Sequence, residues 1–163
     1  MREVVAGLGA FGVTGGSGAH AKPCRGLSAG PGIMGAMRTR LPGMWWGPAF
    51  EAPDPGALAR FYAALLAWPI VHEEPGTAVV GVPGAGSFLV FHAAEGYRPP
   101  VWPPQPGEQR PMMHLDFQVG DLEDALAEAL ALGAVLAEHQ PQPQVRVLFD
   151  PAGHPFCLCR DEG

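Results

Sequence analysis

Two polar side chains that could carry acid–base chemistry, His114 and Asp116, lie two residues apart in the segment 113–119. This segment alternates polar with apolar residues, which predicts a strand whose successive side chains point to opposite faces. His114 and Asp116 then share one face, and a carboxylate beside an imidazole raises the basicity of the ring. We interpret the pair either as catalytic residues or as a hydrogen-bonded polar pair without a chemical role.

Further side chains could contact a ligand near this pair. Cys157 alternates with apolar residues near the end of the chain, and a free cysteine is either a small buried residue or a nucleophile. Arg146 lies between two valines and could bind an anion or lie at a solvated edge. The predicted ligand-binding residues are Trp45, Glu51, Phe91, Arg146 and Cys157.

A glycine pattern near the N-terminus resembles a dinucleotide-binding motif. Gly7, Gly9 and Gly12 have the required spacing, but the motif works only where the third glycine opens a helix that binds the pyrophosphate. Residues 13–18 contain three glycines and cannot form that helix, and no acidic residue follows before Glu51. We therefore predict no nucleotide cofactor, and no other cofactor is indicated.

The elements that position these residues occur twice along the chain. Asp54 and Asp121 are each followed by an amphipathic segment, as expected of helix N-caps, and each is preceded by a strand candidate. The two copies superpose at an offset of 67 residues, which also matches Phe50 with Phe117. Three strand candidates follow each helix. In the first copy they are 69–73, 78–82 and 88–92, and in the second copy 135–139, 145–149 and 156–160.

This repeat sets the predicted domain organisation. Residues 1–43 are rich in glycine, lack apolar periodicity and are predicted to be a flexible leader. Residues 44–161 form one domain, because a module of about 50 residues cannot bury enough surface alone and two must pair. Module one spans 44–94, a proline-rich connector spans 95–111, and module two spans 112–161. The predicted fold class is α+β, with two tandem β-α-β-β-β modules.

The residues that carry a family resemblance are the Asp54-led helix with Phe61 and Tyr62, the segment 114–121, and the Asp-Pro-Ala-Gly turn at 150–153 followed by His-Pro-Phe-Cys. In this respect the chain resembles the vicinal oxygen chelate superfamily of glyoxalase, bleomycin-resistance and extradiol dioxygenase proteins. It looks most like the glyoxalase-like proteins of actinobacteria. The resemblance implies a curved mixed sheet around a cavity that holds a ligand.

In that superfamily, metal ligands come from the first and last strands of each module. Carried over to this sequence, the four ligand positions fall on His114 and Cys157 in module two and on Gly47 and Leu89 in module one. Of these, His114 alone is a usual ligand for such a site, and hard divalent cations favour several carboxylate or imidazole groups. We therefore expect no metal site.

Charge and cysteine content bound the remaining functions. Five of the ten Lys and Arg residues but one of the sixteen Asp and Glu residues lie in residues 1–40, so the rest of the chain is strongly acidic. An acidic body disfavours nucleic acid, and no long apolar run suggests a membrane partner. Three cysteines without a paired motif favour a reducing, cytoplasmic compartment.

The sequence therefore predicts a protein that binds a small organic ligand without a metal, possible as a homodimer. The alternative is a lyase or dioxygenase that acts on a small oxygenated substrate. Loss of three of the four metal-ligand positions favours ligand binding, whereas the pairing of His114 with Asp116 favours the enzyme. Whether the protein is an enzyme stays open at this point.

Overall fold

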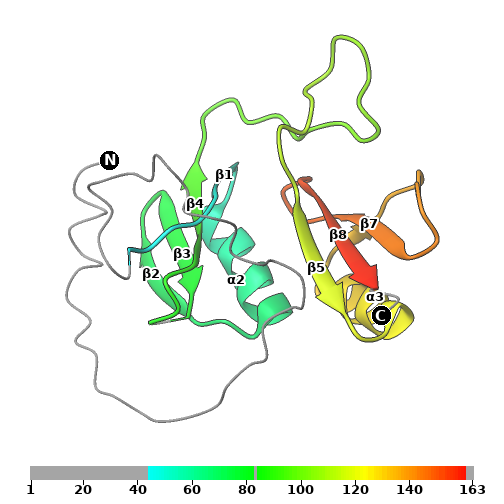
Figure 1. Ribbon diagram of the computed structural model, residues 1–163. Helices are drawn as coiled ribbons and strands as arrows, with labels where there is room; N and C mark the ends of the chain where they lie inside the picture. Colours follow the sequence, from blue (N-terminus) through cyan, green and yellow to red (C-terminus); the bar gives the residue numbers. More distant parts are fainter. Residues whose placement is uncertain (1–43, 83, 161–163) are drawn as a thin grey trace, which may run out of the picture. The chain divides into compact units, whose positions relative to one another are not determined.

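The computed structural model describes residues 44–82 and 84–160 (Figure 1). The residues from Trp45 onward form one compact unit. The leader predicted for residues 1–43 lies outside the described residues.

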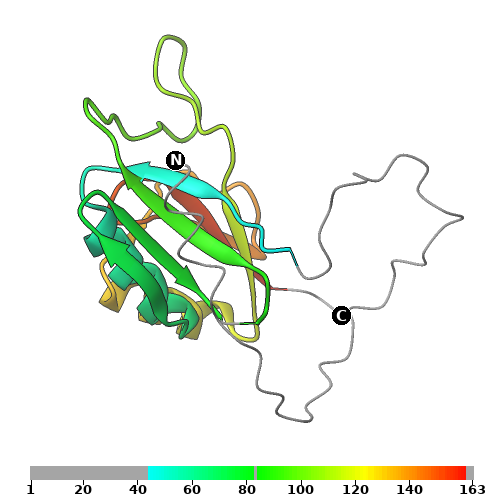
Figure 2. The same ribbon diagram turned by 90° about the vertical axis from the view of Figure 1, so that its left-hand side faces the viewer.

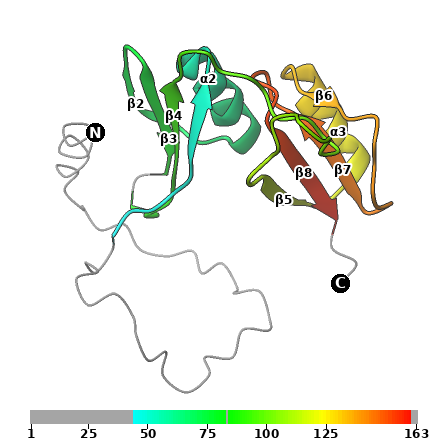
Figure 3. The ribbon, with the colours of Figure 1, turned by 90° about the horizontal axis from the view of Figure 1, so that it is seen from above.

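Two modules of the same composition follow one another. Module one contains β1 (Ala49–Ala52), α2 (Pro55–Leu66), β2 (Ile70–Glu74), β3 (Thr77–Gly81) and β4 (Phe88–Ala93). Module two contains β5 (Leu115–Val119), α3 (Leu122–Ala131), β6 (Val135–Leu136), β7 (Val145–Phe149) and β8 (Pro155–Arg160). The sheets have the orders β1-β4-β3-β2 and β5-β8-β7-β6, so the predicted α+β fold of two β-α-β-β-β modules is confirmed. Figures 2 and 3 show α2 on one face of the first sheet and α3 on one face of the second.

Both helices begin at the predicted aspartates. The Asp54 carboxylate accepts the amide N–H of Ala57 at 2.8 Å, and Asp121 accepts those of Glu123 and Asp124 at 2.9 and 3.0 Å. Each side chain thereby satisfies amide groups that have no partner within the helix. Within the described residues, no helix combines the length and apolar character that crossing a membrane requires.

Strand pairing fixes the equivalence of the two modules. β1 lies parallel to β4 with Ala49 opposite Val90, and β5 lies parallel to β8 with Asp116 opposite Cys157. The offset of 67 residues therefore holds for both strands. The module-one equivalent of Cys157 is Val90, and the sequence-based match to Leu89 was wrong by one residue. A shift of one residue moves a side chain to the other face of a strand, and Leu89 is indeed buried in the core.

One apolar core joins the helix-facing sides of both sheets. Phe50, Phe91 and Tyr62 stack at its centre with ring centroids 5.5 to 6.2 Å apart, and Phe156 of module two lies against Tyr62. Leu115, Phe117 and Val119 pack against this core, whereas Asp116 and Gln118 are exposed. The alternation predicted for β5 is thus confirmed.

The replacements Phe117→Ala and Gln118→Ala test this register. The Phe117 ring lies 6.0 Å from that of Phe156, centroid to centroid, and its deletion should lower the free energy of unfolding by about 3 kcal/mol. Gln118→Ala, on the opposite face, should cost less than about 0.5 kcal/mol. Urea denaturation measures both, and equal losses would show that the register is misassigned.

Candidate functional site

The structure brings together His114, Asp116 and Cys157, which we call the β5 cluster. The Nε2 atom of His114 lies 3.3 Å from a carboxylate oxygen of Asp116, and Cys157 faces Asp116 across the β5–β8 pair. One ligand atom from each of the three side chains lies within 4.8 Å of the others. His114 and Asp116 are exposed, whereas Cys157 is buried. The predicted pair is therefore solvent-accessible and rests on a buried thiol.

Cys157 keeps its proton in this environment. Burial, together with a hydrogen bond and charge repulsion from Asp116, raises the pKa of the Cys157 thiol to about 12. Burial also raises the pKa of Cys159, with a smaller contribution from Asp116. Because the thiolate is the nucleophilic and metal-binding form of cysteine, Cys157 is poorly suited to either role near neutral pH.

The β5 cluster does not fit the metal that the superfamily resemblance implies. Its donors are one imidazole, one carboxylate and one protonated thiol, whereas hard divalent cations favour several oxygen ligands. Module one has Gly47 and Val90 at the positions equivalent to His114 and Cys157, and neither side chain can coordinate an ion. No metal-dependent step can be derived from these residues.

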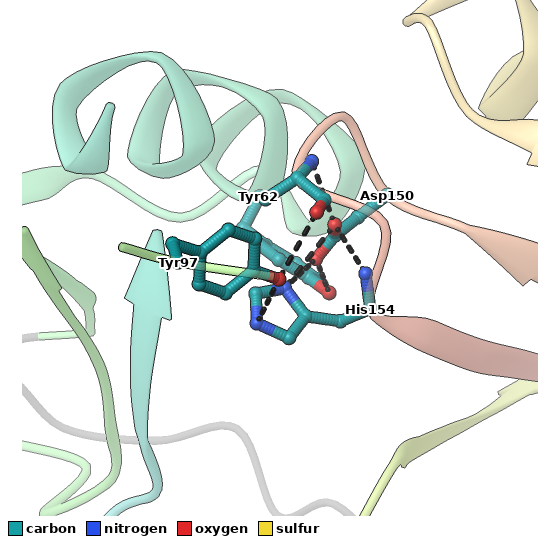
Figure 4. A network of polar contacts seen from close by, with 5 residues as sticks. Tyr62, Tyr97, Asp150 and His154 are labelled. Carbon is teal, nitrogen blue, oxygen red and sulfur yellow. Dashed lines mark hydrogen bonds and ion pairs between the residues drawn. The ribbon is translucent and has the colours of Figure 1, made fainter. Parts of the chain in front are cut away.

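A second polar arrangement, which the sequence did not indicate, joins four side chains: Tyr62, Tyr97, Asp150 and His154 (Figure 4). We call it the Asp150 network. One carboxylate oxygen of Asp150 accepts the Tyr62 hydroxyl at 3.0 Å and lies 3.0 Å from Nδ1 of His154. The other accepts the amide N–H groups of Ala152 and His154, both at 2.9 Å. The Tyr97 hydroxyl lies 3.1 Å from Nε2 of His154 and 3.0 Å from the carbonyl oxygen of Ala152.

This network borders a pocket of about 530 Å³. The pocket is lined by part of β1, by both ends of the connector and by His154. Its residues are Ala49, Phe50, Glu51, Glu95, Gly96, Tyr97, Arg98, Pro100, Gln109, Arg110, Pro111, Met112, Met113 and His154. Both modules and the connector therefore contribute to one pocket, which has apolar walls and a few charged and hydrogen-bonding groups.

Two of the predicted ligand-binding residues are compatible with an exposed site. Glu51 lines the pocket. Trp45 is 42% exposed and packs edge-on against Phe88, outside the pocket lining. The residues of the β5 cluster do not line the pocket either, although Met113, which precedes His114, does.

Phe91 and Arg146 lie elsewhere than predicted. Phe91 is fully buried between Phe50 and Tyr62, because its position on β4 faces α2. Arg146 pairs with Leu158 and shares its helix-facing side, where its guanidinium lies 2.7 Å from the Glu123 carboxylate on α3. Neither side chain is available to a ligand in the pocket.

Comparisons with known proteins agree with this architecture. Residues 48–159, more than half of the chain, match the family model described as "Glyoxalase-like domain". A search of curated proteins gave no match.

Solved structures with the same fold are distant in sequence. A glyoxalase/bleomycin resistance protein/dioxygenase family enzyme from Burkholderia phytofirmans has 16% identity and a TM-score of 0.52, covering 70% of this chain and 95% of its own. The fosfomycin resistance protein FosX from Listeria monocytogenes has 12% identity and a TM-score of 0.54, covering 77% and 93%. Protein ATC0852 from Agrobacterium tumefaciens has 19% identity and a TM-score of 0.53, covering 72% and 96%.

The raised pKa of Cys157 predicts a pH dependence of stability. The unfolded thiol loses its proton near pH 9 and the folded thiol near pH 12, so the unfolded chain binds fewer protons between these values. This contribution to stability is therefore fully present below pH 9 and is lost as the pH rises toward 12. Urea denaturation from about pH 8 to about pH 10.5 should show a shallower decline for Cys157→Ala than for the unmodified chain. Parallel declines would contradict the assignment, and Cys159→Ala is the matched control, with a smaller expected change.

Proposed function

Because the chain belongs to the family of glyoxalase-like domains, we propose that it binds a small organic ligand, without a metal, in the pocket between β1, the connector and His154. The observation that carries this proposal is the pocket itself, to which both modules contribute. Its volume lies within the range of about 300–1,000 Å³ that is common for small-molecule sites.

The composition of the pocket wall supports a ligand that is partly apolar. Met112 and Met113 are exposed, at 90% and 58%, and two prolines add further apolar surface. Exposed methionines are adaptable contacts for apolar ligands, because the side chain is flexible and polarizable. Arg98 and Arg110 oppose Glu51 and Glu95 in the lining, so the pocket suits a ligand with both polar and apolar parts.

The named function of one structural neighbour is compatible with this proposal. FosX is described as a fosfomycin resistance protein, and it shares the fold of this chain. Binding of a small antibiotic-like molecule is therefore within the range of functions that this fold supports, although fold alone does not assign function.

The alternative function is a lyase or dioxygenase that acts on a small oxygenated substrate. The observation that favours it is the β5 cluster, in which an exposed imidazole lies 3.3 Å from a carboxylate. The poor fit of this cluster to a metal favours ligand binding over the enzyme. We also infer a cytoplasmic location from the free Cys157 and Cys159, and retain a homodimer as a proposal.

The replacement Ala49→Phe tests the pocket. Ala49 is exposed on β1 and lines the pocket, so a phenyl ring there should fill part of the volume while leaving the core intact. We expect ligand binding, measured by native mass spectrometry against a panel of small aromatic and oxygenated molecules, to fall at least about tenfold.

The matched control is Ala127→Phe, at an exposed position on α3 outside the pocket. This variant should bind as the unmodified chain does. Equal binding by Ala49→Phe and by the unmodified chain would place the ligand elsewhere, for example at the β5 cluster.

A further inference from the structure

We propose that Tyr97 and His154 together accept a proton from the ligand, and that the ligand class is small molecules with a weakly acidic hydroxyl group, such as phenols and enols. This inference rests on the proposed function, because it concerns the same pocket. It begins with the side chains of the Asp150 network that reach the pocket, which are Tyr97 and His154.

Asp150 fixes the orientation of the His154 ring. The carboxylate is 3% exposed and lies against four donor groups, two of them backbone amides. An ionised carboxylate can only accept hydrogen bonds, so Nδ1 of His154 carries a proton and donates it to Asp150. In the neutral ring, Nε2 is then the unprotonated atom, and it faces the Tyr97 hydroxyl at 3.1 Å. Asp150 is thus a positioning residue for His154.

The Tyr97 hydroxyl has a suitable partner in each protonation state of His154. With a neutral ring, Tyr97 donates its proton to Nε2. With a protonated ring, Nε2 donates to the Tyr97 oxygen, and the Tyr97 hydroxyl donates to the carbonyl of Ala152 at 3.0 Å. Gain of a proton therefore requires only rotation of one hydroxyl hydrogen. Such an arrangement accepts a proton without reorganisation of the surrounding chain.

Tyr97 serves to pass the proton on, because the phenol itself stays protonated at neutral pH. Burial, with the nearby carboxylates of Asp150 and Glu51, raises the pKa of Tyr97 to about 12. In the transfer, the ligand O–H bond breaks and its proton bonds to the Tyr97 oxygen. The original Tyr97 proton moves at the same time to Nε2 of His154. The products are a ligand oxyanion, neutral Tyr97 and a protonated His154.

The charges around the pocket suit these products. Protonated His154 lies beside the Asp150 carboxylate, and Tyr62 donates to the same carboxylate from the core. In the pocket, Arg98 and Arg110 can attract the oxyanion, whereas Glu51 and Glu95 oppose it. Proton transfer is most effective where the donor and acceptor groups have similar acidity, which favours hydroxyl groups that ionise near neutral pH.

The test uses 4-nitrophenol as the probe, because its visible absorption distinguishes the phenol from the phenolate. With the full chain, the bound probe should have a phenolate-to-phenol ratio about tenfold higher than the free probe at the same pH, which is a shift of one pH unit. In Tyr97→Phe and His154→Gln, the probe should still bind, but this ratio should fall back to that of the free probe. The ¹⁵N resonance of His154 Nε2 should move to the protonated position when the unmodified chain binds the probe.

The control is His139→Gln, which replaces an exposed histidine outside the pocket lining and should behave as the unmodified chain does. Urea denaturation checks that each variant is folded, and two different replacements in the relay guard against one that fails to fold. Probe that binds without a spectral change would overturn the proton transfer and leave the ligand pocket in place. Absence of probe binding to the unmodified chain would overturn the proposed ligand class.

Discussion

The buried carboxylate of Asp150 is the constraint on which the pocket depends. Burial of an ionised carboxylate is unfavourable unless its oxygens are hydrogen-bonded, and Asp150 meets this requirement with donors from two modules. Tyr62 donates from α2 in module one, and Ala152 and His154 donate from the turn before β8 in module two. The burial of Tyr62 and its proximity to Asp150 raise the pKa of this phenol well above its ordinary value, so it remains a donor. The carboxylate therefore links the two modules through groups that cannot easily find other partners.

The turn held by Asp150 positions two further features. It leads directly into β8, and the pairing of β8 with β5 places Cys157 beside Asp116. It also receives the connector, because Tyr97 bonds to Ala152 and His154. Gly153 has φ of 90°, and a Cβ atom there would lie 2.6 Å from Pro99. A side chain at this position would be strained and would displace the connector. The wall of the pocket thus depends on the turn.

Local signals allowed much of the fold to be predicted from the sequence. Asp54 and Asp121 mark helix starts because the capping interaction involves residues two or three positions apart. The offset of 67 residues held across both parallel strand pairs, and it assigned Phe117 to the core. The match of Cys157 to Leu89 failed because that strand was aligned by its aromatic residue, Phe88, rather than by the offset. The Asp-Pro-Ala-Gly turn was also predicted, but its sequence does not show what the Asp150 carboxylate contacts.

The site was less predictable, because its contacts join residues far apart in the chain. Tyr97 lies in a proline-rich connector without periodicity, and its partner His154 is 57 residues away. Arg146 was placed on the wrong face because the valines beside it suggested the helix-facing core. Those valines instead belong to a second apolar cluster with Trp102 of the connector, on the face opposite α3. Both faces of β7 are apolar, so alternation alone could not distinguish them.

The most direct test of the linking role of Asp150 is a double-mutant cycle with Asp150→Asn and Tyr97→Phe. The two side chains do not share a hydrogen bond, and they are joined through His154. If Asp150 holds the connector through His154, the loss in unfolding free energy for the double variant should be smaller than the sum of the single losses by at least about 0.5 kcal/mol. Losses that add to within about 0.3 kcal/mol would show that the connector is held independently of Asp150 and would contradict the account.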